Sequence, residues 1–422
     1  MPATASSTTP IGVTSPREHA GQSKPGLVAL RGWAAVAVVL LHASVPYANP
    51  AMPGLAWPVR DIATDPGWTT SLVTHGMWAI EVFIMPVFLV LAGFLAHQSF
   101  AQRDASSVVR SRLWRLGLPF VLGMLLVGPA DLYTWLLGWA VEERIPLIKM
   151  RSLKFEAGVD DGLWGTSHLW FLMYLASYFA VIGALGHRAR NQIGKISKQH
   201  PCWCGSGLFL AACFILTLAP EVVWGFQHSF LPIPSKWAYS GAFFLAGLLL
   251  GQHDRTLDHM ERLGPRTLSV GLVCLAAATA LGMWCVAQPH DATFARITLG
   301  CLTPLAASTV TLGLLGTAQR LVTQPDRVTS HLAAASLWIY VLHHPIIGLS
   351  HITWKVTGFT TNPLWKVMAS TVIGVLWACA CRSLIRTCYE RQRARSVEQE
   401  PQVLAFESGS NSEKRQSARR AA

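Results

Sequence analysis

An apolar stretch with two ionisable side chains on one face most constrains the fold of this chain. Residues 26–47, GLVALRGWAAVAVVLLHASVPY, are numerous enough to cross a bilayer as a helix, which takes about 20 residues. Arg31 and His42 are eleven positions apart. At about 100° per residue both side chains emerge on nearly the same face, separated by about 16 Å along the axis. Because a bilayer penalises ionisable groups, this alignment indicates a function.

Further apolar blocks of similar length follow, and charged residues make up only 13% of the 422 residues. A soluble protein usually carries about 25% charged residues, and its apolar residues form a stripe rather than long blocks. The sequence therefore predicts an all-α, polytopic transmembrane bundle of about ten helices. The expected spans are residues 27–47, 78–96, 116–139, 168–185, 208–224, 237–251, 268–286, 299–318, 333–349 and 364–384.

The net charge of +12 suggests nucleic-acid binding, but its distribution indicates membrane insertion instead. Alternating the spans places the basic loops 103–115, 188–198 and 255–266 and the basic C-terminal tail on one side. Cytoplasmic loops carry an excess of Lys and Arg. We therefore predict a multi-pass protein of the cell membrane with both termini in the cytoplasm and no nucleic-acid partner.

Three segments follow from this pattern. Residues 1–24 and 387–422 are polar, and we expect two disordered cytoplasmic tails. Residues 25–386 form the transmembrane domain. His200, Cys202 and Cys204 resemble half of a metal site, but no second pair of ligands follows nearby, and we predict no metal.

His42 is the first candidate for chemistry. An ionisable residue in a lipid-embedded helix indicates function by default, although a histidine hydrogen-bonded to a neighbouring helix is the structural alternative. Imidazole accepts a proton near neutral pH and can stay uncharged until then, which suits a general base in a site of low dielectric constant.

Arg112 and Arg115 lie at positions i and i+3 of RLWR, on one helical face just before an apolar span. Considered alone, the two arginines are better explained by the ordinary positive charge that flanks a membrane span. The functional alternative is an anion clamp, because guanidinium groups bind phosphate bidentately. Arg31, on the same side of the membrane, completes a basic mouth for a nucleotide-bearing ligand.

Four further polar side chains lie in or at the ends of apolar spans. His168 opens SHLWFLMYL, where an interfacial aromatic belt explains Trp170 better than it explains the histidine. His343 and His344 lie inside the ninth span, and Pro345 after them loosens the backbone hydrogen bonding. Glu81, near the outer end of the second span, could pair with any of these histidines, or could be an interfacial carboxyl.

These motifs, taken in order, resemble acyltransferase family 3, whose members are integral-membrane enzymes that move acyl groups, often acetyl or succinyl, onto sugars and other acceptors. The matching segments extend over residues 27–384. Two positions depart from the pattern: Ala92 stands where the family usually has Ser, and Pro86 where it often has a polar residue. The matching residues are Arg31 with His42, Leu91-Ala92-Gly93-Phe94, Arg112 with Arg115, His168-Leu169-Trp170-Phe171-Leu172 and IYVLHHP at 339–345.

The resemblance implies an O-acyltransferase that uses acyl-coenzyme A as donor substrate and holds no permanent cofactor. RLWRLGLP and HLWFL look most like the branch of the glucan biosynthesis protein C succinyltransferases, so the acceptor would be a glycan or similar hydroxyl compound outside the cytoplasm. The implied roles are phosphate binding for Arg31, Arg112 and Arg115, catalysis for His42 with His168 or Glu81, and substrate binding for Trp170, His343 and His344.

A transporter or flippase of a glycan or small solute is the competing class. Membrane histidines would serve proton coupling equally well. Such a protein often has broken helices repeated in two halves, and the sequence shows no convincing internal repeat.

Overall fold

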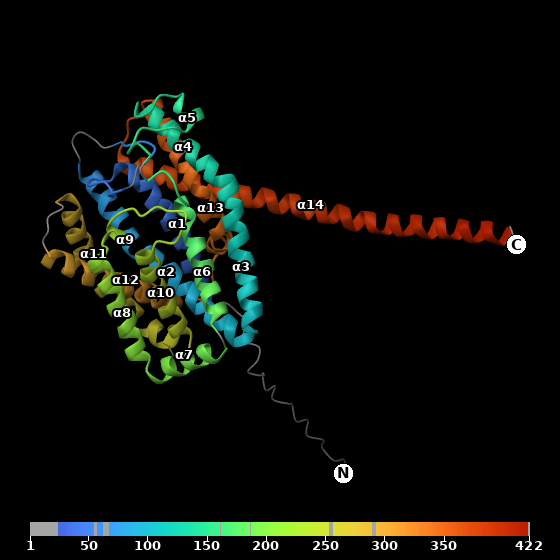
Figure 1. The fold of residues 1–422 in the computed structure, drawn as a ribbon, viewed down its shortest axis with the longest axis horizontal. Coiled ribbons are helices and arrows are strands. Elements are labelled where there is room, and N and C mark those ends of the chain that lie inside the picture. The colour runs from blue at the N-terminus through green and yellow to red at the C-terminus, as the bar shows by residue number, and fades with distance from the viewer. Residues whose placement is uncertain are drawn as a thin grey trace, which may run out of the picture.

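In a computed structural model, the described residues are 24–54, 57–61, 67–160, 162–185, 187–252, 256–288 and 293–420, and they form helices and no strand. The elements in chain order are α1 (Pro25–Ser44), η1 (Val45–Tyr47), α2 (Trp68–Gln102), α3 (Ala105–Leu122), η2 (Gly123–Val127), α4 (Gly128–Val141), α5 (Lys149–Ser152), η3 (Ser167–Leu169), α6 (Trp170–Ala184), α7 (His187–Gln199), α8 (Pro201–Leu218), α9 (Glu221–Trp224), α10 (Pro234–Gly251), α11 (Thr256–Ala287), α12 (Thr293–Leu321), α13 (Arg327–Val356) and α14 (Pro363–Arg420) (Figure 1).

The all-α polytopic bundle is confirmed. Within the described ranges, nine helical segments are long and apolar enough to cross a membrane. The remaining predicted span, 237–251, is also helical, as α10, but the polar start of α10 at Pro234, Ser235 and Lys236 lowers its mean hydropathy. The basic segment 187–199, expected as a loop, forms the amphipathic helix α7.

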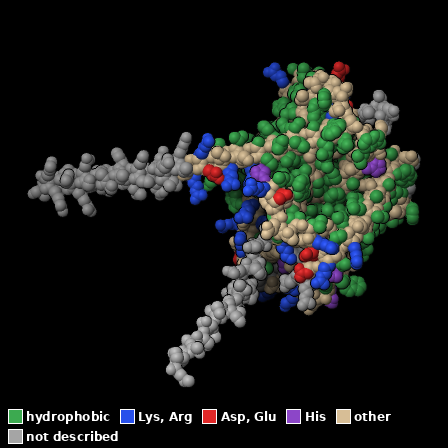
Figure 2. All heavy atoms as spheres, turned by 180° about the vertical axis from the view of Figure 1, so that it is seen from behind, with side chains coloured by type: hydrophobic (Ala, Val, Ile, Leu, Met, Phe, Trp, Pro, Cys, Tyr) green, Lys and Arg blue, Asp and Glu red, His purple; other side chains and the backbone are tan. Residues whose placement is uncertain are grey.

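The surface of the bundle matches a membrane environment. Figure 2 shows hydrophobic side chains spread broadly over one face, with many Lys and Arg side chains toward the lower end. Large apolar residues such as Leu126 and Val273 are more than two-thirds exposed, at 71% and 72%. In water such exposure would be unfavourable, whereas lipid chains solvate these groups.

α1 lies inside the bundle, where it packs against α2, α12, α13 and α14. α3, the π-helical stretch η2 and α4 follow one another without a break, and together they form one candidate membrane span, Ala105–Val141. The N–H of Gly128 donates a hydrogen bond to the carbonyl of Gly123, five residues back, which is the π-helical pattern. Pro129, the next residue, has no N–H to donate. This turn sets the direction in which the side chains of α4 point.

The structure describes one of the two predicted tails and not the other. Residues 1–23 lie outside the described residues. Beyond Arg386, where we expected disorder, α14 continues as a helix to Arg420 and extends away from the bundle (Figure 1).

Helices α2 and α10 approach closely at two glycines. A Cβ atom added at Gly93 would lie 2.1 Å from the carbonyl oxygen of Phe244, and one at Gly247 would lie 2.2 Å from that of Val90. The glycine of the Leu91–Phe94 motif is therefore needed for backbone contact between helices.

We predict that Gly93→Ala lowers the thermal stability of the detergent-solubilised protein, because the methyl group has no space; overpacking typically costs about 1–3 kcal/mol. Gly76→Ala is the matched control on the same helix, since nothing lies within 4 Å of its added Cβ. The melting temperature of each variant is measured by heating samples to a series of temperatures and recording the remaining folded protein by size-exclusion chromatography. Equal melting temperatures for the two variants would show that the close contact is not required.

Candidate active site

A cavity of about 290 Å³ lies at the end of the bundle where α1 ends and α6 begins. Loop residues 162–166 line it on one side, together with Gly225, Phe226, His228 and Phe230. The helical residues around it include most of the candidates named above and one carboxylate that was not among them: His42, Glu81, Asp131, Trp135, His168, Trp170 and His344. Five histidines or carboxylates from five different helical elements thus meet in one place.

His42 is held by two hydrogen bonds to the same nitrogen. Its Nδ1 lies 3.0 Å from the carbonyl of Val38 and 3.0 Å from Nε2 of His343. Nδ1 of His343 lies 2.8 Å from the carbonyl of Ile339 and must donate to it, so Nε2 of His343 is an acceptor. His42 therefore carries its proton on Nδ1, which leaves the lone pair of Nε2 available on the cavity side.

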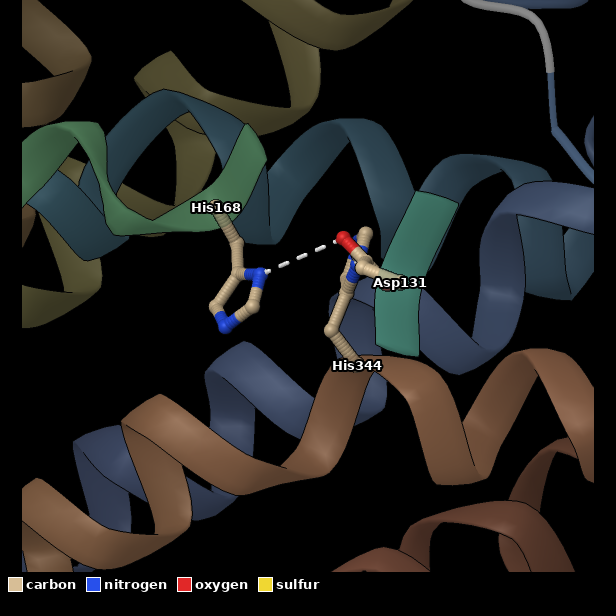
Figure 3. Close-up of side chains that lie close together, drawn as sticks. All are labelled: Asp131, His168 and His344. Carbon is tan, nitrogen blue, oxygen red and sulfur yellow. Dashed lines mark hydrogen bonds and ion pairs between the residues drawn. The ribbon is translucent and has the colours of Figure 1, made fainter. Parts of the chain in front are cut away.

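Asp131 is the centre of a second group (Figure 3). Nδ1 of His344 lies 2.8 Å from Oδ1 and 2.9 Å from Oδ2 of Asp131. Ser167 Oγ donates a hydrogen bond to the same carboxylate, and Nδ1 of His168 lies 3.8 Å from Oδ2, as the dashed line in Figure 3 marks. The side chains come from α4, η3 and α13, so this carboxylate joins three elements far apart in the sequence.

Both ring nitrogens of His168 face protein groups. Its Nε2 lies 3.0 Å from the carbonyl of Val341, and its Nδ1 points to Ser167 and Asp131. Tyr340 donates a hydrogen bond to the His168 carbonyl. His168 is thus brought into the site as predicted, but its contacts are those of a residue that joins η3 to α13.

Asp131 escaped the sequence analysis, although the signal was present. It is a carboxylate inside the apolar span 116–139, and the reasoning applied to His42 applies equally to it. The other overlooked side chains are Trp57 and Trp135, which enclose His344. The His344 ring is stacked on Trp135 at 4.8 Å between centroids and perpendicular to Trp57 at 5.2 Å.

Glu81 and Trp170 both lie near Lys236, whereas we expected Glu81 beside a histidine. The ammonium group of Lys236 lies 4.0 Å from the centre of the Trp170 ring, a cation–π contact. Lys236 also lies close enough to Glu81 to act on it electrostatically. Both charged groups line the cavity, whereas no hydrogen bond or ion pair joins Glu81 to a histidine in the described part of the chain.

The three arginines do not line this cavity. Arg31 donates a hydrogen bond of 3.1 Å to the carbonyl of Ala333 on α13. Arg112 donates to Ser99 Oγ at 3.0 Å and lies 5.7 Å from the Phe179 ring centre, and the positive charge of Arg115 acts on it. Within the described structure, the hydrogen-bond partners of Arg31 and Arg112 therefore lie on different helices, α13 and α2.

In the described part of the chain, one set of residues has ligand atoms close enough together to hold a metal ion, away from the cysteine segment considered above. Asp131, His168 and His344 offer ligand atoms that all lie within 4.8 Å of one another. In this geometry Nδ1 of His344 is hydrogen-bonded directly to Asp131. The proton of His344 therefore lies between these two atoms, where a metal ion would otherwise be bound. His200, Cys202 and Cys204 are not among the residues that could hold a metal in the described part of the chain.

A bundle of candidate membrane-spanning helices with a buried group of histidines around one carboxylate defines the class: a multi-pass membrane protein. The family model described as an acyltransferase domain, Acyl_transf_3, matches residues 25–383. The chain therefore belongs to acyltransferase family 3. No curated protein and no solved structure matches it.

The loop wall of the cavity is held by His228. The backbone N–H of Ser167 donates to Nε2 of His228 at 2.6 Å, and Nδ1 of His228 lies 2.8 Å from the carbonyl of Gly162. Ser167 has a left-handed backbone, with φ of 49°, which costs energy for a residue other than glycine. Burial, more than any other cause, lowers the pKa of His228 below its ordinary value of 6.5.

We predict that His228 makes the stability of this loop depend on pH. Because its folded-state pKa is lowered, its contribution is complete above about pH 6.5 and is lost as the pH falls below that value. His228→Gln should therefore lower the free energy of unfolding at pH 7.5 by about 1 kcal/mol and lower the melting temperature with it. The difference in melting temperature from the wild type should be smaller at pH 5. A difference that stays constant between these pH values would contradict the prediction. His75→Gln, at an exposed position on α2, is the control.

Proposed function

We propose that this protein transfers an acyl group, acetyl or succinyl, from cytoplasmic acyl-coenzyme A to a hydroxyl group of a glycan or similar acceptor on the other side of the cell membrane. The hydrogen bond between His42 and His343 carries the proposal, because it leaves the second nitrogen of His42 free on the cavity side. A base in this state is ready to take a proton.

The reaction follows from this arrangement. His42 Nε2 takes the proton of the acceptor hydroxyl while the oxygen attacks the thioester carbonyl carbon. The tetrahedral intermediate then collapses, the carbon–sulfur bond breaks, and coenzyme A is released as its thiol once the sulfur takes up a proton. A route through an acyl group carried on His42 uses the same residues.

The acceptor would enter from the loop side of the cavity. Tryptophan side chains and two oppositely charged groups line this part, a combination that suits sugar rings: the rings pack on aromatic faces, and the hydroxyls bond to the carboxylate and the ammonium. The residues concerned are Trp57, Trp164, Trp170, Glu81 and Lys236. A glucan acceptor, as in the branch that the motifs resemble, fits this description.

The donor would bind near the arginines at the other end of α1. Arg112 and Arg115 are on one helix face and near each other, which suits the phosphates of coenzyme A. Arg31 lies eleven residues before His42 on α1, so the thioester would pass along this helix to reach the base.

We predict that His42→Ala lowers the rate of acyl transfer about 10²- to 10⁴-fold, because the hydroxyl loses its base. Purified protein is incubated with acetyl- or succinyl-coenzyme A and an oligoglucan, and release of free thiol and acylated product is measured. His75→Ala is the control for histidine removal outside the cavity. Unchanged transfer by folded His42→Ala would disprove the assignment, and absence of thioester cleavage by the wild type with every short acyl donor would favour a transporter.

We further predict that the double variant Arg112→Ala/Arg115→Ala raises KM for acyl-coenzyme A roughly 10-fold or more, because each charge-assisted hydrogen bond contributes about 1.5–3 kcal/mol. The KM for an acyl-pantetheine donor, which has no nucleotide, should change little. Arg110→Ala is the matched control, since this exposed side chain lies two residues before Arg112 on another face of α3. Equal effects on both donors would contradict phosphate binding at this position.

A further inference from the structure

We propose that His344, held by Asp131, is a second proton-transfer residue of this site: it protonates the departing sulfur while His42 deprotonates the acceptor. This inference rests on the proposed acyl transfer and adds to it a division of labour between two histidines. Four observations on the described residues support it.

The first observation is that only two histidines in the cavity have a nitrogen to spare. Both nitrogens of His168 and both of His228 face protein partners, as described above. His343 also uses both of its nitrogens and does not line the cavity. His42 and His344 each use Nδ1 alone within the described structure.

The second observation is that the spare nitrogens reach the cavity. Neither Nε2 of His42 nor Nε2 of His344 is among the fully buried polar atoms that lack a partner. His351, on the same helix as His344, shows the contrast, because its Nε2 is fully enclosed and unpartnered. The open nitrogens of His42 and His344 can therefore meet a substrate.

The third observation is that the two histidines have different partners. His344 donates to both oxygens of a carboxylate, and a negative charge at this distance stabilises the imidazolium form. His42 has only uncharged partners, the Val38 carbonyl and the His343 ring, which favour its neutral form in a buried site. The surroundings of His344 therefore favour its protonated form more than those of His42 do, and such a difference between two neighbouring groups can divide them into an acid and a base.

The fourth observation is their proximity. The rings of His42 and His344 are perpendicular, with centroids 4.8 Å apart. Both line the same cavity, so one substrate can contact both. The ring of Trp135, stacked on His344, limits its rotation and keeps Nε2 directed away from Asp131.

The proton balance closes over one turnover. His42 accepts the hydroxyl proton as the new carbon–oxygen bond forms, and His344 donates its Nε2 proton to the sulfur as the carbon–sulfur bond breaks. The products are the ester and the free thiol of coenzyme A. The site is then left with protonated His42 and neutral His344, and transfer of one proton between the neighbouring rings restores the starting state.

Donors with different leaving groups test this role. An aryl thioester leaves as a stable thiolate and needs no acid, whereas the alkyl thiolate of coenzyme A benefits from one. With acyl-coenzyme A, we expect His344→Gln to lower kcat about 10²-fold, within the usual range for an acid–base group. With an acyl thiophenol ester, the same variant should retain kcat to within a few-fold of the wild type.

Three further variants sharpen the test. His42→Ala should lose activity with both donors, because the acceptor still needs its base. Asp131→Asn should resemble His344→Gln, because the neutral amide no longer stabilises the imidazolium. His351→Gln, a buried position on α13 outside the cavity, is the matched control for folding, and the melting temperature of every variant is measured alongside.

The outcomes separate clearly. Equal losses with both donors in folded His344→Gln, or no loss with either, would overturn the inference and leave the acyl transfer intact. Stoichiometric zinc in the purified wild type, removed by a chelator together with activity, would also overturn it, because the same three side chains would then be metal ligands. Failure of the wild type to cleave any donor would instead reject the proposed function, and the inference with it.

Discussion

The hydrogen-bonded pair of Asp131 and His344 is the interaction on which the arrangement of the site depends. Asp131 is only 4% exposed, so most of its hydrogen-bond donors must be supplied by the protein. Asp131 has them from α13 and from η3. Removing one partner of a buried pair typically costs about 3–5 kcal/mol, because the remaining charge is left unpaired. This requirement keeps α4, η3 and α13 in one fixed register.

The same burial would also favour proton transfer within the site. Electrostatic interactions are stronger where the effective dielectric constant is low, and a proton moved between two fixed imidazole rings needs little reorganisation of the surroundings. The rings of Trp57 and Trp135 enclose His344 and contribute to this environment. Close helix packing at Gly93 and Gly247 provides the rigid frame.

Hydropathy and motif order were enough to predict the bundle, its spans and the family. They also placed His42, His168, Trp170 and His344 in one site, because motifs at the ends of antiparallel spans meet at one side of a membrane. What they could not supply is the rotation of each helix about its own axis. That rotation decides that His343 bonds to His42 rather than to a substrate, and that Glu81 lies near Lys236 rather than a histidine. It depends on local events such as the π-helical turn before Asp131, which hydropathy does not record.

The separation between the arginines and the cavity bears on how the proposed transfer would cross the membrane. Arg31 is bonded to α13 at one end of α1, and His42 to α13 at the other. The same two helices therefore flank both the donor region and the base. Since none of the arginines lines the cavity, a thioester arriving from their side would have to pass between α1 and its neighbours. Acyl transfer would then require local separation of helices that pack closely here, whereas the acceptor side already has an open cavity bounded by loops.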